Sequence, residues 1–190
     1  MFWNADAQTM ALPQRRDLQL EALREALTTA MGAPFFARRL AGIRIEDIRS
    51  LEDLEHLPVI GKDDLRRSEF ESPPMGDYRI ARLSQAVRIG MSSGTTGKPT
   101  TMIWTRHDLD VECELSARNH YRMGIRPGMV IVSAHPGYLN GGQALQQAAY
   151  DYMGCLLVSI GPPESVEAAE RALRAVADLP IDRWQVFPPR

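Results

Sequence analysis

The chain has 190 residues, of which 44% are hydrophobic and 24% are charged, and its formal net charge is -2. This balance excludes a disordered chain and a strongly basic nucleic-acid binder, and two cysteines cannot build a disulfide framework. The sequence also lacks a run of about 18 apolar residues and the pattern of a secretory signal. We therefore expect a cytoplasmic protein without a membrane or nucleic-acid partner, made of one domain or of one domain with a small appendage.

The first part of the chain favours short helices. Residues 1–12 show no periodicity and are expected to fray. From Pro13 to Gly32, leucine and alanine recur at three- and four-residue spacing, which predicts an amphipathic helix. Pro34 then suits the first turn of a second, shorter helix.

The helical pattern continues in shorter pieces over residues 45–72, where proline and glycine interrupt it. Ser50 and Asp53 resemble a capping box, with aspartate in place of the preferred glutamate. We therefore predict a helical microdomain over residues 1–72, and a linker rich in proline and glycine directly after it.

After the linker the pattern changes to that of an α/β domain over residues 73–190. Two β-type runs flank a loop at 91–100, and a helix that begins after Thr105 is predicted to end at Gly124. Strands and helices then alternate. Buried strands are predicted over 129–135 and 155–161, a short strand over 184–187, and helices over 143–154 and 165–179. This alternation predicts βαβ units with a parallel sheet covered on both faces. A three-stranded sheet leaves an open edge, so we expect the natural protein to continue beyond Arg190.

The loop from Met91 to Thr100, MSSGTTGKPT, has the composition of a polyphosphate site. Its two glycines permit positive φ, so that successive backbone N–H groups converge on one point. Its hydroxyl side chains and one lysine add further donors. The residues of this candidate site are Ser92, Ser93, Gly94, Thr95, Thr96, Gly97 and Lys98.

Two other interpretations of this loop are less favoured. In the P-loop of NTPases a glycine stands where this chain has Ser92, and a hydroxyl residue follows the lysine where this chain has Pro99. Proline also disfavours the α conformation at Lys98, so no helix is expected to begin there. A hairpin turn without a ligand is the remaining alternative.

The loop SSGTTGKPT (92–100) is similar to the phosphate-binding loop of the adenylate-forming superfamily, which includes acyl- and aryl-CoA ligases. Three upstream segments resemble the phenylacetate–CoA ligases within it. They are LPVIGKDDLR (57–66), ESPPMG (71–76), and PFFARRLAG with IEDIRSLEDLEHLP over 34–58. The resemblance covers residues 30–160. It implies that 73–190 is part of an AMP-binding domain, with a β-hairpin phosphate loop followed by a βαβαβ parallel sheet.

The resemblance also implies a two-step reaction that needs ATP, Mg²⁺ and coenzyme A. ATP and a carboxylic acid give an acyl-adenylate and pyrophosphate, and a thiol then accepts the acyl group. Preorganised donors stabilise the charge that develops on the leaving pyrophosphate. Lys98, Thr95 and Thr96 are the residues that this resemblance assigns to catalysis, and no protein metal ligand is assigned.

A second site is expected in the loop SAHPGYLNGG (133–142), because ligands bind beyond the carboxyl ends of strands in open α/β sheets. Tyr138 matches the tyrosine that lines the acyl pocket of phenylacetate–CoA ligases, which favours an aromatic acid. Gly141 and Gly142 match the glycine pair that precedes the next helix, and His135 departs from the family's tyrosine. Packing of Tyr138 on the sheet, and a hydrogen-bonded strand-end role for His135, are the alternatives.

Two functional hypotheses follow. In the first, the chain is the N-terminal portion of a longer acid–CoA ligase, because the superfamily's later motifs are absent from these residues. The acceptor is coenzyme A or a carrier-protein thiol. In the second, the chain is a truncated, non-catalytic relative that binds nucleotide or a protein partner, with a homodimer covering the open sheet edge.

Overall fold

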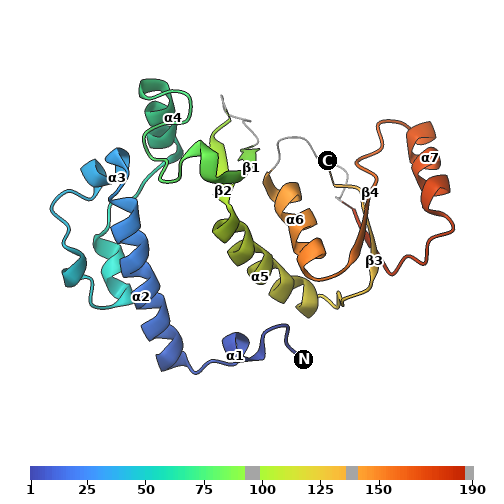
Figure 1. The fold of residues 1–190 in the computed structure, drawn as a ribbon, viewed down its shortest axis with the longest axis horizontal. Helices are drawn as coiled ribbons and strands as arrows, with labels where there is room; N and C mark the ends of the chain where they lie inside the picture. The colour runs from blue at the N-terminus through green and yellow to red at the C-terminus, as the bar shows by residue number, and fades with distance from the viewer. Residues whose placement is uncertain (93–98, 136–140, 187–190) are drawn as a thin grey trace. The chain divides into compact units, whose positions relative to one another are not determined.

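The computed structural model describes residues 1–92, 99–135 and 141–186, and the chain divides into two compact units. The helical unit comprises Asp6–Gln85 with Gly94–Thr101, and the α/β unit comprises Met1–Ala5, Ala86–Ser93 and Met102–Arg190. Helices and strands alternate in the order expected of an α/β chain with a helical beginning (Figure 1). The division after residue 72 stays a prediction, while 73–85 group with the helical unit.

The helical unit consists of short helices joined by turns, as the interrupted sequence pattern predicts. Its elements are α1 (Ala5–Gln8), α2 (Leu12–Ala30), α3 (Pro34–Arg39), α4 (Lys62–Glu71) and the 3₁₀ helices η1 (Ile45–Asp47), η2 (Leu51–His56) and η3 (Leu83–Gln85). Pro34 stands in the first turn of α3, where its missing N–H costs nothing. The Ser50 backbone N–H donates to the Asp53 carboxylate over 2.8 Å, which confirms the predicted cap.

The core of the helical unit is small and centred on Phe35 of α3. Its ring meets Phe36 edge-on at 5.2 Å and Tyr78 at 6.1 Å between centroids. Leu40, Ile48 and Met75 are also buried. The longest helix, α2, buries none of its residues completely and packs on η1 and η2, where Arg24 donates to the carbonyl oxygen of Ile48 over 2.8 Å.

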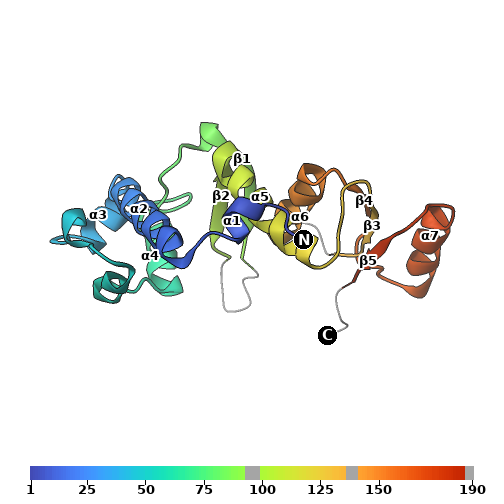
Figure 2. The same cartoon turned by 90° about the horizontal axis from the view of Figure 1, so that it is seen from below.

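The α/β unit confirms the predicted hairpin and the βαβαβ order. Strands β1 (Ala86–Met91) and β2 (Thr101–Thr105) form a two-stranded sheet, and α5 (Arg106–Arg122) follows. The second sheet is parallel with strand order β4-β3-β5, built from β3 (Val130–Ser133), β4 (Leu156–Ser159) and β5 (Arg183–Gln185). The crossover helices α6 (Gly141–Tyr152) and α7 (Val166–Val176) lie on opposite sides of this sheet (Figures 1 and 2).

Helix α5 begins and ends where the sequence predicts. The Thr105 Oγ1 accepts from the Asp108 N–H, and the Asp108 carboxylate accepts from the Thr105 N–H over 2.7 Å. Gly124 directly after the helix has φ +93°, a conformation that glycine adopts without strain. These contacts involve neighbours in the sequence, so they are predictable from it.

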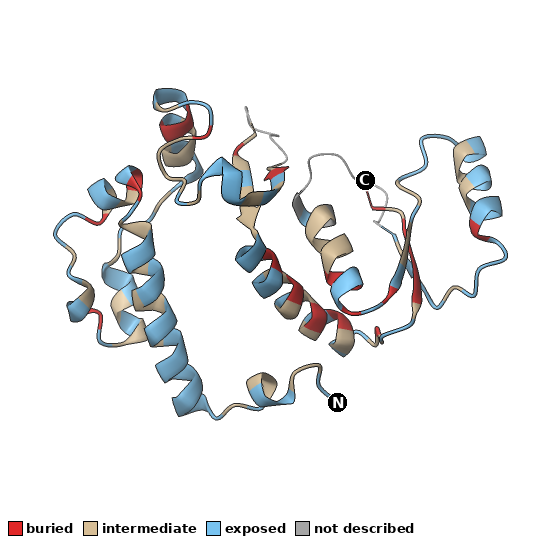
Figure 3. Ribbon diagram, in the orientation of Figure 1, coloured by how far each residue is buried: buried red, intermediate tan, exposed pale blue. Residues whose placement is uncertain are grey.

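Burial in the α/β unit is concentrated on the central strand and on the helices α5 and α6 (Figure 3). Every residue of β3 is buried. The prediction that β4 is a second buried strand is wrong, because the strand order places β4 at an edge and Leu156 is 55% exposed. Trp184 of the other edge strand is 46% exposed.

The prediction that residues 1–12 fray is also wrong for the first residues. The Trp3 indole N–H donates to the Glu114 carboxylate over 2.9 Å, and the Asn4 amide donates to the other oxygen over 2.9 Å. The Trp3 ring lies 5.9 Å from the rings of Tyr121 and Tyr152. The N-terminus is therefore attached to α5 and α6 by contacts that cannot be predicted from the local sequence.

Candidate functional site

The candidate phosphate loop lies between two paired strands. β1 ends at Met91, β2 begins at Thr101, and the next helix does not start until Arg106. This confirms that extended backbone, and no helix, follows Lys98, which is the feature that separates this loop from a Walker-type P-loop. Ser92 is half-buried at the entry, whereas Ser93, Gly94, Thr95, Thr96, Gly97 and Lys98 lie outside the described residues, so their roles stay predictions.

The exit of the loop is attached to helix α4. The Thr101 backbone N–H donates to Oε1 of Glu69 over 3.0 Å, and the Tyr78 hydroxyl donates to the same oxygen over 2.7 Å. The Tyr78 oxygen also lies 3.2 Å from the carbonyl oxygen of Thr101. Glu69 is only 3% exposed and the neighbouring Thr100 is buried. No motif in the sequence marks Glu69 or Tyr78 for this contact, since neither lies near the loop along the chain.

The environment of Tyr78 keeps its hydroxyl protonated. Burial, followed by the hydrogen bond to Glu69 and the charge of that carboxylate, raises the pKa of Tyr78 far above its usual range. A protonated hydroxyl is a donor throughout the physiological range. The pair therefore presents a fixed acceptor, the Glu69 carboxylate, to the Thr101 N–H.

The second predicted site lies at the carboxyl end of β3. His135 is buried there, and its backbone N–H donates to the Ser133 hydroxyl over 3.3 Å. Gly141 and Gly142 open helix α6, which packs on β1, the strand that leads into the phosphate loop. Tyr138 lies outside the described residues, so its place in an acyl pocket stays a prediction.

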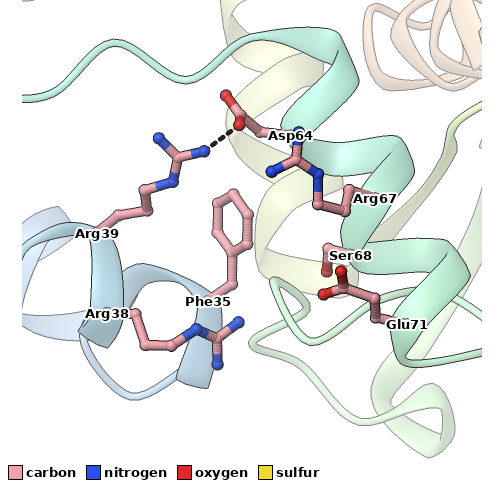
Figure 4. A pocket seen from close by; sticks show the side chains of 7 residues that line it. All are labelled: Phe35, Arg38, Arg39, Asp64, Arg67, Ser68 and Glu71. Atoms are coloured by element: carbon pink, nitrogen blue, oxygen red, sulfur yellow. Dashed lines mark hydrogen bonds and ion pairs between the residues drawn. The ribbon is translucent and has the colours of Figure 1, made fainter.

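A recess of about 290 Å³ opens between α3 and α4. It is lined by Phe35, Arg38, Arg39, Asp64, Arg67, Ser68 and Glu71. Figure 4 shows the Arg39 guanidinium reaching the Asp64 carboxylate past the ring of Phe35, and Arg38 pairs with Asp77 over 2.7 Å. The hydrogen bond from the Gly61 N–H, followed by the charge of Arg39, lowers the pKa of Asp64. Two of the three arginines, Arg38 and Arg39, are thus paired with carboxylates, and the Arg39–Asp64 pair links α3 to α4.

A second recess of about 410 Å³ lies in the α/β unit, between α5, α6 and β5. His120 stacks on Tyr150 with 4.7 Å between ring centroids, and its Nδ1 has no hydrogen-bond partner within the described residues. Burial lowers the pKa of His120, which favours the neutral ring. The walls are mainly apolar, so this recess offers little to a charged ligand.

Neither a metal centre nor a membrane helix is found in the described part of the chain. No group of three or more histidine, cysteine, aspartate or glutamate residues is placed to hold a metal ion there. No helix of that part combines the length and the apolar character that crossing a membrane requires.

Comparison with protein families gives two findings of unequal extent. A family model described as the N-terminal TPP-binding domain of thiamine pyrophosphate enzymes matches residues 94–178, which is less than half of the chain. Phenylacetate–coenzyme A ligases match nearly all of it. The ligase of Thermus thermophilus is 34% identical over 183 residues, which cover 94% of this chain and 39% of the relative. The ligase of Escherichia coli K12 is 30% identical over 185 residues, covering 95% and 40%.

Solved structures give the same result. The chain is similar to 2-hydroxyisobutyryl-CoA ligase in complex with 2-HIB-AMP and CoA, with a TM-score of 0.83 and 30% identity over 92% of this chain and 37% of that one. For an open conformation of that ligase the TM-score is 0.86, with 27% identity over 96% and 43%.

The chain thus spans about 40% of the length of the ligases that it matches. Those matches include the helical and the α/β parts together, whereas the thiamine pyrophosphate model matches the α/β alternation alone. In sequence and in fold, the chain is similar to the N-terminal region of the acyl- and aryl-CoA ligases of the adenylate-forming superfamily.

Proposed function

We propose that this chain is the N-terminal portion of an ATP-dependent ligase that joins a carboxylic acid to coenzyme A. The observation that carries the proposal is the donor-rich loop at 91–100, held between two paired strands with no helix after it. Identity to phenylacetate–CoA ligases along most of the chain supports it. The cytoplasm is the compartment that the free, buried cysteines and the composition favour.

The loop residues have distinct roles in this proposal. Gly94 and Gly97 allow the backbone N–H groups to converge, and the hydroxyls of Ser92, Ser93, Thr95 and Thr96 add donors around the phosphates. Lys98 supplies a full positive charge. As the acid's carboxylate attacks the α-phosphorus, negative charge moves onto the leaving pyrophosphate, where these donors stabilise it.

The loop offers many hydrogen-bond donors to phosphate oxygens and no carboxylate to a metal ion. N–H, hydroxyl and ammonium groups donate hydrogen bonds to phosphate, whereas Mg²⁺ in nucleotide sites is held mainly by one or two carboxylates, waters and the phosphates themselves. In our proposal Mg²⁺ therefore accompanies ATP and neutralises part of its charge. Coenzyme A is the proposed acceptor in preference to a carrier-protein thiol, since the similar solved structures are CoA complexes.

For the acid we propose an aromatic, phenylacetate-like substrate. Tyr138 and its counterpart in the phenylacetate ligases support this assignment, with His135, Gly141 and Gly142 shaping the same loop. An aliphatic acid is the alternative, because one similar solved structure is a 2-hydroxyisobutyryl-CoA ligase, whose acyl group is aliphatic. A panel of aromatic and aliphatic acids distinguishes the two classes.

The test is acid-dependent ATP–pyrophosphate exchange by the complete polypeptide. We expect Lys98→Ala and Gly94→Val to abolish exchange, and Lys62→Ala to leave it unchanged because Lys62 is an exposed side chain at the start of α4. Unchanged exchange in both loop variants would refute the loop assignment. Nucleotide binding without exchange for any acid would instead favour the non-catalytic alternative.

A further inference from the structure

We propose that Glu69 is a positioning residue for the phosphate loop and that it acts, together with Tyr78, through the backbone of Thr101. The inference rests on the proposed function of that loop and adds a role for the helical unit. The Glu69–Tyr78–Thr101 contact is called the brace below. All three residues belong to the same compact unit.

The brace contacts both backbone polar groups of Thr101, its N–H through Glu69 and its carbonyl oxygen beside the Tyr78 hydroxyl. Glu69 Oε1 accepts from the Thr101 N–H at 3.0 Å, and the Tyr78 hydroxyl, 2.7 Å from the same oxygen, lies 3.2 Å from the Thr101 carbonyl oxygen. Hydrogen bonds to a charged acceptor are about twice as strong as neutral ones. Since Glu69 is 3% exposed, water does not compete for this carboxylate.

The brace is itself anchored in the helical unit. Asp77, next to Tyr78, accepts from the Ser68 hydroxyl over 2.7 Å and from Arg38 over 2.7 Å. The Tyr78 ring packs on Phe35. Glu69 and Ser68 are neighbours on α4, so the helix and the returning segment approach the loop as one connected structure.

A short and stiff segment connects the brace to the proposed catalytic lysine. Thr101 lies three positions after Lys98, separated from it by Pro99, whose ring restricts φ, and by the buried Thr100. A displacement at Thr101 therefore moves the end of the loop. Misplacing a catalytic group by about 1 Å costs about a hundredfold in rate.

The test uses the complete protein and five variants, one of which combines Glu69→Gln with Tyr78→Phe. Glu69→Gln keeps the shape but removes the charge, and Tyr78→Phe removes only the hydroxyl. Glu71→Gln is the matched control, because Glu71 is an exposed glutamate on the same helix. Lys98→Ala reports separately on the proposed role of the loop.

We expect Glu69→Gln and Tyr78→Phe to lower kcat for ATP–pyrophosphate exchange by about tenfold to a hundredfold, with the KM for the acid unchanged. The double variant should lose no more than the more severe single variant, because the two residues act as one unit. Hydrogen exchange should become faster in the peptide that contains Thr101. Glu71→Gln should stay within about twofold of wild type.

Each outcome has one meaning. Wild-type kcat in both brace variants, with Lys98→Ala inactive, overturns the positioning role and leaves the proposed function intact. A loss of kcat that equals the loss of folded protein by circular dichroism also overturns it, because the brace would then be structural only. Full activity of Lys98→Ala refutes the proposed role of Lys98 in the loop, and the positioning inference falls with it, whereas a wild-type protein without acid-dependent exchange refutes the proposed function itself.

Discussion

Replacing Gly76 by alanine should destabilise the helical unit far more than an ordinary glycine substitution. Gly76 has φ +75°, in the left-handed region that side chains rarely adopt. A Cβ at this position would lie 2.6 Å from the Ser68 hydroxyl and 2.7 Å from the Tyr78 ring. Two independent features therefore require glycine at position 76: the backbone conformation, and the lack of space for a Cβ atom.

The cost can be worked out from these two requirements. The left-handed conformation costs alanine about 1–2 kcal/mol. Displacing Ser68 breaks its hydrogen bond to the Asp77 carboxylate, and such bonds to charged groups contribute about 1.5–3 kcal/mol. We therefore expect Gly76→Ala to lower the free energy of unfolding by about 3–4 kcal/mol.

Gly42 is a control in the same unit. Its φ is +86°, and a Cβ there would have nothing within 4 Å. Gly42→Ala should therefore lose only the backbone contribution of about 1–2 kcal/mol. Urea denaturation followed by circular dichroism at 222 nm measures both. Equal losses in the two variants would refute the argument that crowding around Ser68 and Tyr78 matters.

Three further predictions concern the α/β unit. Glu114→Ala removes the acceptor of the Trp3 indole, so Trp3 should leave its site and the tryptophan emission should shift to the red. The free energy of unfolding should fall by about 1–3 kcal/mol. Unchanged emission would contradict the docking of Trp3 on α5. Burial lowers the pKa of His120 in the folded state, so stability should decrease as the pH falls below about 6.5, and His120→Phe should remove that part of the slope in urea titrations. Burial raises the pKa of the thiols of Cys113 and Cys155, so a disulfide reagent should label them slowly in native protein and quickly in urea; fast native labelling would contradict their burial.

The elements that could be predicted from the sequence are those whose signals are local. Two helix caps, Ser50–Asp53 and Thr105–Asp108, each join residues three positions apart. The start of α3 is likewise marked by a single residue, Pro34. The alternation of strands and helices likewise indicates a parallel sheet, because crossovers of this length connect parallel neighbours. These predictions are confirmed.

The environment of the candidate site could not be predicted in the same way. The Thr101 N–H and its acceptor Glu69 are 32 positions apart, and Trp3 and Glu114 are 111 positions apart. No spacing rule links residues at such separations. The expectation of a buried β4 failed for a related reason, because the strand order, and not the apolar composition, decides which strand is central.

The sequence by itself therefore determined the class of the fold, the hairpin position of the loop at 91–100 and the chemistry of its donors. Helix caps, glycine turns and hydrophobic periods are set by interactions between near neighbours, and a motif contains its own functional groups. Only the tertiary structure decided that α4 reaches the exit of the loop through Glu69, that the N-terminus docks on α5, and that β3 is the central strand, buried along its whole length. Those contacts arise when distant segments pack, and their partners are chosen by the topology of the whole chain.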